Sequence, residues 1–258
     1  MARDFNAKNI IVGAATFYVG KAGEEQTKIV LNSASATAQD PTKVVASASA
    51  YWYHLGYTQN GVTMNIQPTY GEVTVDQLLD VAKMFKSGQQ VTVATSLTEG
   101  TLENLYVAIG GRTGANGDIK LNGNLDSASS VVSADSGPTN LDSGAASLYF
   151  SASSAASVNA GSVAGVLDIN GGSLGYEPVE RSVLFVGPGP SNLVSGTTNK
   201  AERVYIGYRA VSMDAVGVAV QRDNATLFPV NFRMLPSSIN ESNDGNAAYG
   251  KIIDRVYV

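Results

Sequence analysis

Short stretches in which apolar and polar residues alternate one by one are the feature of this chain that most constrains its fold. Side chains on a β-strand point alternately to its two faces, so this period of two is typical of strands with one buried face. The sequence therefore predicts a mainly β protein. The alternating stretches are residues 62–66, 91–97, 204–208, 216–220 and 228–234.

Two dipeptides in the sequence are typical of turns between such strands. Asn60-Gly61 stands directly before the first alternating stretch, and this pair is a strong signal for a tight hairpin turn. Asp223-Asn224 separates the last two stretches and predicts a turn there. The stretch at residues 10–20 is apolar but lacks a clean cationic leader, so we interpret it as a first strand rather than a secretion signal.

One segment, residues 101–109, has the spacing of an amphipathic helix. Thr101 is suited to cap its start, and Gly110-Gly111 is suited to end it. A helix this short is not stable alone, so it must pack its apolar stripe on a sheet. The predicted stripe consists of Leu102, Leu105, Tyr106 and Ile109.

The composition suggests that much of the protein's surface is covered by other molecules. Of the 258 residues, 44% are hydrophobic, which is enough for a core, but only 15% are charged, against about 25% in typical soluble domains. Self-association would explain a surface with few charges, although a Ser/Thr-rich β protein would have the same composition. We expect one domain over residues 1–258 with a Ser/Ala/Gly-rich insertion at about residues 112–182, because no Lys or Arg occurs between Lys120 and Arg181.

The residue types that carry enzyme chemistry are almost missing. The chain has no cysteine, and its one histidine, His54, lies among aromatic residues, which predicts a packed or rim side chain rather than a ligand. The GGSLG sequence at residues 171–175 matches a serine-nucleophile pattern, but a Tyr-Glu-Pro sequence follows where a helix is needed. We therefore expect no catalytic residue, no cofactor and no metal. The net charge of −5 disfavours a surface that binds nucleic acid through its phosphates. No apolar run approaches the length of a membrane span, so we expect no membrane partner.

The order of several short motifs resembles a known family. The first part reads WYHLGYT at residues 52–58, GVTM at 61–64, YGEVTVDQ at 70–77, QVTVAT at 90–95 and LTEGTLENL at 97–105. The C-terminal part reads ATLFPVNFR at residues 225–233 and YGKIIDR at 249–255. In this order the motifs resemble the tail tube proteins (major tail proteins) of long-tailed bacteriophages, and the resemblance covers about half of the chain.

The resemblance implies a β-sandwich or half-barrel with one short packed α-helix. It also implies that subunits join as hexameric rings whose inner sheets continue into one ring-wide β-barrel. Stacked rings would form the tail tube of a virion, assembled in the host cytoplasm. The implied partners are further copies of the chain, the tape-measure protein, the tail-tip and head-proximal tail proteins, and phage DNA that passes through the lumen without sequence-specific binding.

Two groups of residues are candidates for contacts in such an assembly. Residues 68–88 are expected to reach the adjacent ring, and deleting residues 81–87 is expected to abolish tubes but leave a folded monomer; a plain surface hairpin is the alternative. An acidic series with a spacing of four would share one face if it lay on a strand, which predicts a lumen wall or ring interface, with a solvated acidic row as the alternative. The ring-stacking candidates are Lys83, Phe85 and Lys86, and the acidic candidates are Glu72, Asp76 and Asp80.

Other assignments remain open at this stage. A secretion-system tube or a virion decoration protein would also be a structural β assembly, and a secreted adhesin or hydrolase is the remaining alternative. We further expect Trp52 and Tyr106 in the core, and residues 1–9 either docked on a neighbouring subunit or frayed.

Overall fold

We describe a computed structural model of the chain. It describes residues 11, 13–22, 31, 36–40, 44, 52–77, 80–110, 119–122, 166–169, 178–190, 199–213, 216–218, 226–241 and 247–257. Within this part the protein is mainly β, with one helix, α1 (Leu102–Ile109). The strands are β1 (Thr16–Ala22), β2 (Trp52–His54), β3 (Thr58–Thr74), β4 (Val81–Leu97), β5 (Ile119–Asn122), β6 (Val166–Ile169), β7 (Glu180–Pro188), β8 (Lys200–Ser212), β9 (Phe228–Leu235), β10 (Ser237–Glu241), β11 (Ala247–Ala248) and β12 (Gly250–Tyr257).

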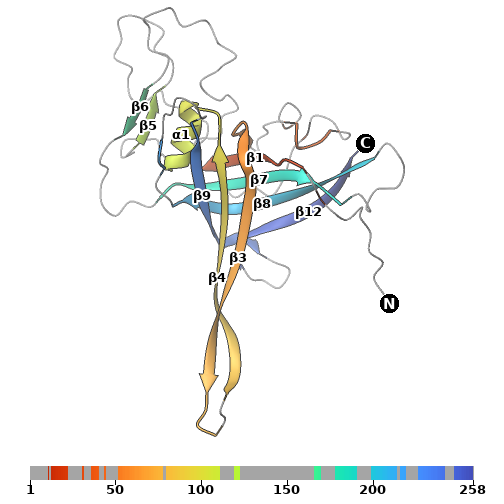
Figure 1. Ribbon diagram of the computed structural model, residues 1–258, viewed down its shortest axis with the longest axis vertical. Helices are drawn as coiled ribbons and strands as arrows, with labels where there is room; N and C mark the ends of the chain where they lie inside the picture. Colours follow the sequence, from red (N-terminus) through yellow and green to blue (C-terminus); the bar gives the residue numbers. More distant parts are fainter. Residues whose placement is uncertain are drawn as a thin grey trace, which may run out of the picture.

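One antiparallel sheet of eight strands forms the body, in the order β2-β1-β7-β8-β9-β4-β3, and it forks at β8. Residues 200–207 of β8 pair with β12, whereas residues 209–212 pair with β9. The two branches diverge, so β7, β8 and β12 run across the direction of β3 and β4 (Figure 1). The sheet is open among the described residues, and β5-β6 and β10-β11 form two small separate ladders.

The main core lies between the part of the sheet formed by β1 and β7 and the part formed by β9 and β4. Phe17 of β1 is central, because its ring stacks on Phe185 of β7 at 6.3 Å and on Phe232 of β9 at 6.0 Å between centroids. Alternating residues of β4 and β9 complete this core, as their period of two predicts. Each fully buried side chain of this size contributes about 1.5–3 kcal/mol. The buried residues of β4 and β9 are Val91, Val93, Leu97, Phe228, Val230, Phe232 and Met234.

A second apolar cluster covers the other face of β1, β7 and β8, so β7 is buried on both faces. Trp52 is part of it, and the prediction that Trp52 and Tyr106 are core residues is confirmed. Residues 36–40 lie over this face, where the Tyr18 hydroxyl donates to the Ala38 carbonyl at 2.8 Å.

Helix α1 has the predicted ends but a different buried face. The backbone N–H of Asn104 donates to the Thr101 hydroxyl, and Gly110 ends the helix with φ 76°. Tyr106 is buried as predicted, but so are Asn104, Val107 and Ala108, while Leu105 and Ile109 are only half-buried. The stripe prediction was therefore partly wrong, because the helix is covered on a wider face than a single line of apolar residues indicates; the side chain of Leu102 lies outside the described part.

Two further predictions of local structure were wrong. Asn60 and Gly61 do not turn between strands; they form a bulge inside β3, between the pairs Gln59–Ser96 and Val62–Thr95. Both have positive φ, 65° and 73°, the conformation that a tight turn would also need. Of the strand predicted at residues 216–220, residues 216–218 are not in a strand, and residues 219–220 lie outside the described residues.

Several predictions fall on residues that the structure does not describe. These are the turn at residues 223–224, the GGSLG sequence at residues 171–175, residues 1–9 and most of the expected insertion at 112–182. At the end of that range, residues 180–182 belong to β7 in the main sheet. The described part of the chain contains no helix long and apolar enough to cross a membrane.

Candidate assembly surface

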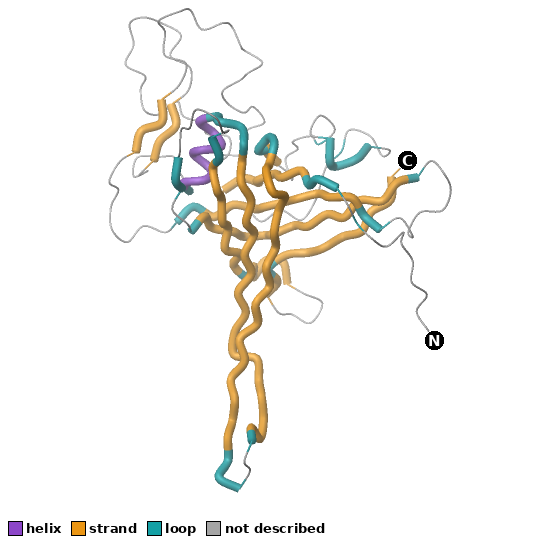
Figure 2. Tube along the Cα trace, viewed as in Figure 1, coloured by secondary structure: helices purple, strands orange, loops and turns teal. Residues whose placement is uncertain are grey.

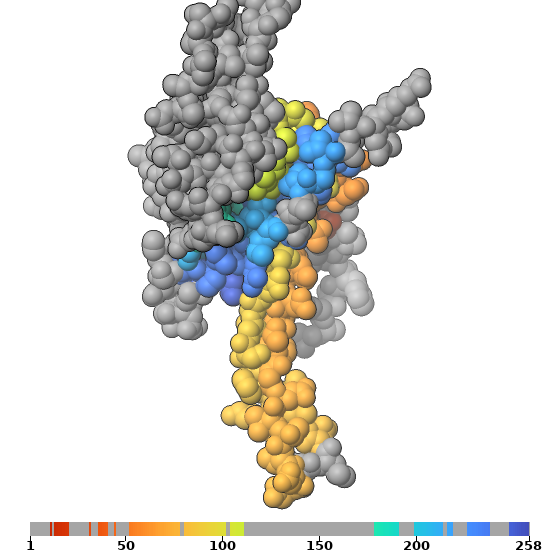
Figure 3. Space-filling model, turned by 90° about the vertical axis from the view of Figure 1, so that its left-hand side faces the viewer, coloured from red at the N-terminus to blue at the C-terminus, as the bar shows by residue number. Residues whose placement is uncertain are grey.

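The distal half of the β3-β4 hairpin extends beyond the body as an arm (Figure 2). We define the arm as residues 67–74 of β3, residues 81–90 of β4 and the turn between them. Eight strand residues span about 26 Å. Figure 3 shows the arm standing clear of the body in a second direction.

Almost every described residue of the arm is exposed, including large apolar side chains. Tyr70 is 56% exposed and Met84 is 57% exposed. An isolated two-stranded hairpin is marginally stable in water, and contiguous exposed apolar side chains mark interaction sites. The exposed apolar residues of the arm, its turn and its base are Ile66, Tyr70, Val73, Val75, Met84 and Phe85.

The register of the hairpin assigns these residues to two faces. Ile66 pairs with the buried Val91, so both side chains lie on the side of the sheet that faces the core. We call the continuation of this side along the arm the apolar arm face. Because paired residues share a face and alternate residues on one strand do too, Tyr70 and Met84 lie on this face and Phe85 lies on the opposite one. The apolar arm face comprises Ile66, Pro68, Tyr70, Glu72, Met84, Lys86 and Gln89.

The predicted ring-stacking residues all lie on β4 within the arm, but not on one face. Lys83 and Phe85 share the face opposite to the apolar arm face, and Lys86 lies on the apolar arm face, where it pairs with Tyr70. The Lys86 ammonium donates to the Gln89 side-chain oxygen. The predicted contact loop is therefore a continuous two-stranded ladder, and its two faces can contact different surfaces.

The three acidic candidates do not form a row on one strand. β3 ends at Thr74, so Glu72 lies on the strand, Asp76 lies in the turn and Asp80 lies directly before β4. The Asp80 carboxylate accepts a hydrogen bond from the Val81 N–H at 2.7 Å, a local contact that shapes the end of the turn. Their role at a lumen or a ring interface remains a prediction.

A broad polar face lies on the side of β9, β4 and β3 away from the core. Its residues are amides, hydroxyls and small side chains, and Arg233 is the one charged residue of the set. No carboxylate occurs in this set, so the face offers neither a dense anionic nor a dense cationic field. The polar face comprises Thr63, Asn65, Gln67, Gln90, Thr92, Ala94, Ser96, Pro229, Asn231 and Arg233.

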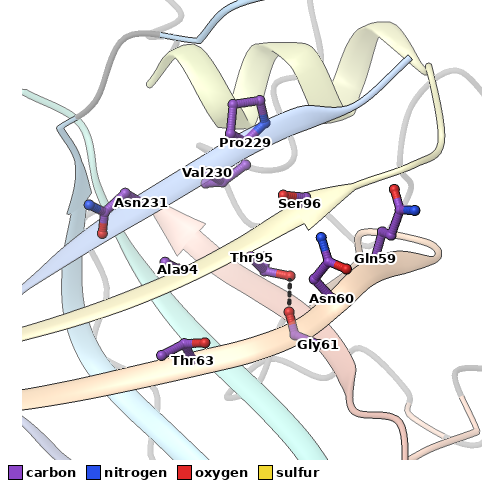
Figure 4. Close-up of a pocket in the computed structure, with 10 residues that line it drawn as sticks. All are labelled: Gln59, Asn60, Gly61, Thr63, Ala94, Thr95, Ser96, Pro229, Val230 and Asn231. Carbon is purple, nitrogen blue, oxygen red and sulfur yellow. Dashed lines mark hydrogen bonds between the residues drawn. The ribbon is translucent and has the colours of Figure 1, made fainter. Parts of the chain in front are cut away.

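A shallow pocket of about 330 Å³ opens on this polar face at the Asn60-Gly61 bulge (Figure 4). The Thr95 hydroxyl donates to the Gly61 carbonyl at 2.8 Å and thereby fixes the bulge to β4. Ala94, Pro229 and Asn231 form its other side. Neutral side chains and backbone line the pocket, so it presents no ionised group to a ligand.

Sequence reasoning missed an ion pair with a fully buried carboxylate at the start of β8. Glu202 is fully buried, and its carboxylate accepts hydrogen bonds from the Thr37 hydroxyl at 2.6 Å and the Ala38 N–H at 3.0 Å. It also forms a 2.7 Å ion pair with Arg255 of β12, which donates to the Ala36 carbonyl. This group ties residues 36–38 and β12 to β8. No local pattern marks it, because its members are far apart in the sequence.

Exposed sheet edges are the remaining surface suited to association. Among the described residues, β12 pairs only with β8 and β3 pairs only with β4, so each has one edge without a partner. β3 carries a bulge and Pro68, two features that limit edge-to-edge pairing, whereas β12 keeps a regular register along its length.

Taken together, the described residues define a mainly antiparallel β protein with surfaces suited to association. They contain no cluster of His, Cys, Asp or Glu arranged to hold a metal ion. The sequence matches no protein-family model, and a search of curated proteins also finds no match.

Proposed function

We propose that this protein is a structural subunit that assembles with copies of itself into stacked hexameric rings, forming the tail tube of a long-tailed phage. The observation that carries the proposal is the exposed arm. It is a two-stranded extension with large apolar side chains on both faces, and such a hairpin needs a cover to be stable. The motif order of the sequence supports a tail tube as the kind of assembly.

The open sheet and the symmetry of association support the same proposal. When the arm of one subunit binds a different surface on the next subunit, the contact is head-to-tail. Repeating such a contact produces closed rings or open stacks. The edges of β3 and β12 without a partner are available for pairing between subunits within a ring.

We assign the polar face to the wall of the lumen in this proposal. Its uncharged amides and hydroxyls provide no array of cations to hold phosphate groups, so duplex DNA would pass without tight binding. Glu72 then belongs to contacts between subunits, because it lies on the apolar arm face rather than on the polar face. The tape-measure protein would occupy the same lumen before DNA does.

Electron microscopy of the purified protein in a concentration series tests this function. We expect hollow tubes or stacked six-fold rings. The matched variant replaces residues 68–89 with Asn-Gly, which joins the paired Gln67 and Gln90 by a two-residue turn. We expect this variant to remain folded, by circular dichroism, and to form no tubes.

Two results would contradict the proposal. One is a wild-type protein that stays monomeric at every concentration, even when mixed with tail-tip and tape-measure proteins. The other is a variant with the shortened arm that forms tubes as readily as the wild type.

A further inference from the structure

β12 carries an exposed apolar strip on the same side of the sheet as the main core. Ile252 is 52% exposed and Val256 is 43% exposed, and Asp254 lies between them on this face. Ile252 pairs with Tyr205, whose ring stacks on Phe185 at 4.3 Å between centroids. The strip is therefore the outer margin of the main core, as is the apolar arm face on the other branch of the fork.

The strip and the apolar arm face have the same spacing. On β3, Ile66 and Tyr70 are four residues apart with Pro68 between them; on β12, Ile252 and Val256 are four residues apart with Asp254 between them. Four strand residues span about 13 Å in both cases. Two strands laid face to face would therefore bring both apolar pairs into contact at once, in either strand direction.

The charges beside the two surfaces are also compatible. The apolar arm face carries one anion and one cation, Glu72 and Lys86. On the strip, the Asp254 carboxylate accepts two hydrogen bonds from one edge of the Arg203 guanidinium, from Nε at 2.5 Å and from Nη2 at 2.8 Å. Each surface is therefore neutral in net charge, and on the strip the Asp254–Arg203 ion pair lies between the two apolar side chains.

We infer that the apolar arm face of one copy packs on the β12 strip of a second copy. The inference rests on the proposed function, and it specifies which surface receives the arm. The two surfaces cannot meet within one copy, because the branches that carry them diverge from β8 (Figure 1). The contact is head-to-tail, so each copy uses its arm once and its strip once, and the contact propagates from copy to copy.

Cross-linking between single-cysteine variants tests this contact, because the chain has no cysteine of its own. Pro68→Cys and Asp254→Cys place one thiol at the centre of each surface. The cross-linker is a bis-maleimide long enough to join two thiols across about 10 Å, the distance between sheets packed face to face. The two variants are mixed, assembled and treated, and we expect a covalent dimer on a denaturing gel.

The matched control is Thr69→Cys, which moves the thiol by one residue to the opposite face of the arm. Mixed with Asp254→Cys, it should give at least tenfold less dimer, and each variant alone should give none. If the protein assembles but the Pro68→Cys mixture yields no more dimer than this control, the inference is overturned and the proposed function stands. Samples that show no assembly by microscopy overturn both.

Discussion

The ring of Phe85 on β4 lies over Gly71 on β3, its cross-strand partner in the arm. A Cβ atom at residue 71 would come within 2.6 Å of the Phe85 ring, so the ring occupies the space that a side chain there would need. An aromatic ring that covers a cross-strand glycine shields backbone that is otherwise bare and fixes the register of the strands. The conformation of the arm therefore depends on this pair as well as on its backbone ladder.

Replacing Phe85 with Ala should loosen the arm without unfolding the body. We expect limited proteolysis to cut the arm several-fold faster, while the free energy of unfolding of the body changes by less than about 0.5 kcal/mol, as for other exposed positions. Phe85→Tyr keeps the ring and serves as the control. Equal cleavage rates in Phe85→Ala and Phe85→Tyr would show that the ring does not order the arm.

Glu202→Gln should be more destabilising than removal of a partly exposed ion pair. The fully buried carboxylate loses its charge-assisted hydrogen bonds to Thr37 and Ala38 and its ion pair with Arg255, whose side chain is 29% exposed, so the expected cost is about 1–3 kcal/mol. Asp254→Asn breaks the partly exposed pair with Arg203 and should cost less than about 1 kcal/mol. Denaturant unfolding of both variants checks the order, and similar losses would contradict the assigned role of Glu202.

His54 should make the fold less stable in mild acid. Burial lowers its pKa below the ordinary value of 6.5, although Glu99 partly opposes this effect. Its Nδ1 also accepts a hydrogen bond from the Gly56 N–H at 3.2 Å, which a proton on Nδ1 would abolish. The unfolded chain therefore binds the proton more readily, and stability falls as the pH drops below about 6.5, levelling off below the folded pKa.

Unfolding measured from about pH 7 to about pH 5 tests this dependence. The variant His54→Gln does not titrate in this range, so its stability should change less with pH than that of the wild type. Identical slopes in the two proteins would assign the pH dependence to other groups.

The two caps of α1 should each contribute measurably to stability. Thr101→Ala removes the acceptor for the Asn104 N–H and should cost about 1 kcal/mol, whereas Thr101→Ser should restore most of it. Gly110→Ala places a side chain at φ 76°, and the left-handed conformation costs about 1–2 kcal/mol for a residue with a Cβ. Thermal unfolding that is unchanged in both Ala variants would refute this account.

Features set by neighbouring residues were predictable from the sequence. The ends of α1 follow from Thr101 and Gly110, and the buried faces of β4 and β9 follow from their alternation. The Asn60-Gly61 bulge was mistaken for a turn, because the local preference for positive φ is the same in both. Only the pairing with β4, which is distant in sequence, distinguishes them.

Features that depend on distant pairing were not predictable. The sequence placed the candidate contact residues in one segment, but it did not show that Lys83 and Lys86 lie on opposite faces of a ladder. The acidic spacing suggested one strand because the turn after Thr74 has no glycine or proline to mark it. The partners of Glu202 come from residues 37–38 and from Arg255, so no local pattern predicts them.

The fork at β8 has a mechanical consequence. β8 is hydrogen-bonded to β12 over its first part and to β9 over its last part, and β9 continues through β4 into the arm. A pull along the arm therefore loads the β4-β9 ladder in shear, where many hydrogen bonds resist together rather than opening one at a time. From β9 the load passes into β8 and so to β12. Tension applied at the tip of the subunit is thus carried across its whole body by backbone rather than by side-chain contacts.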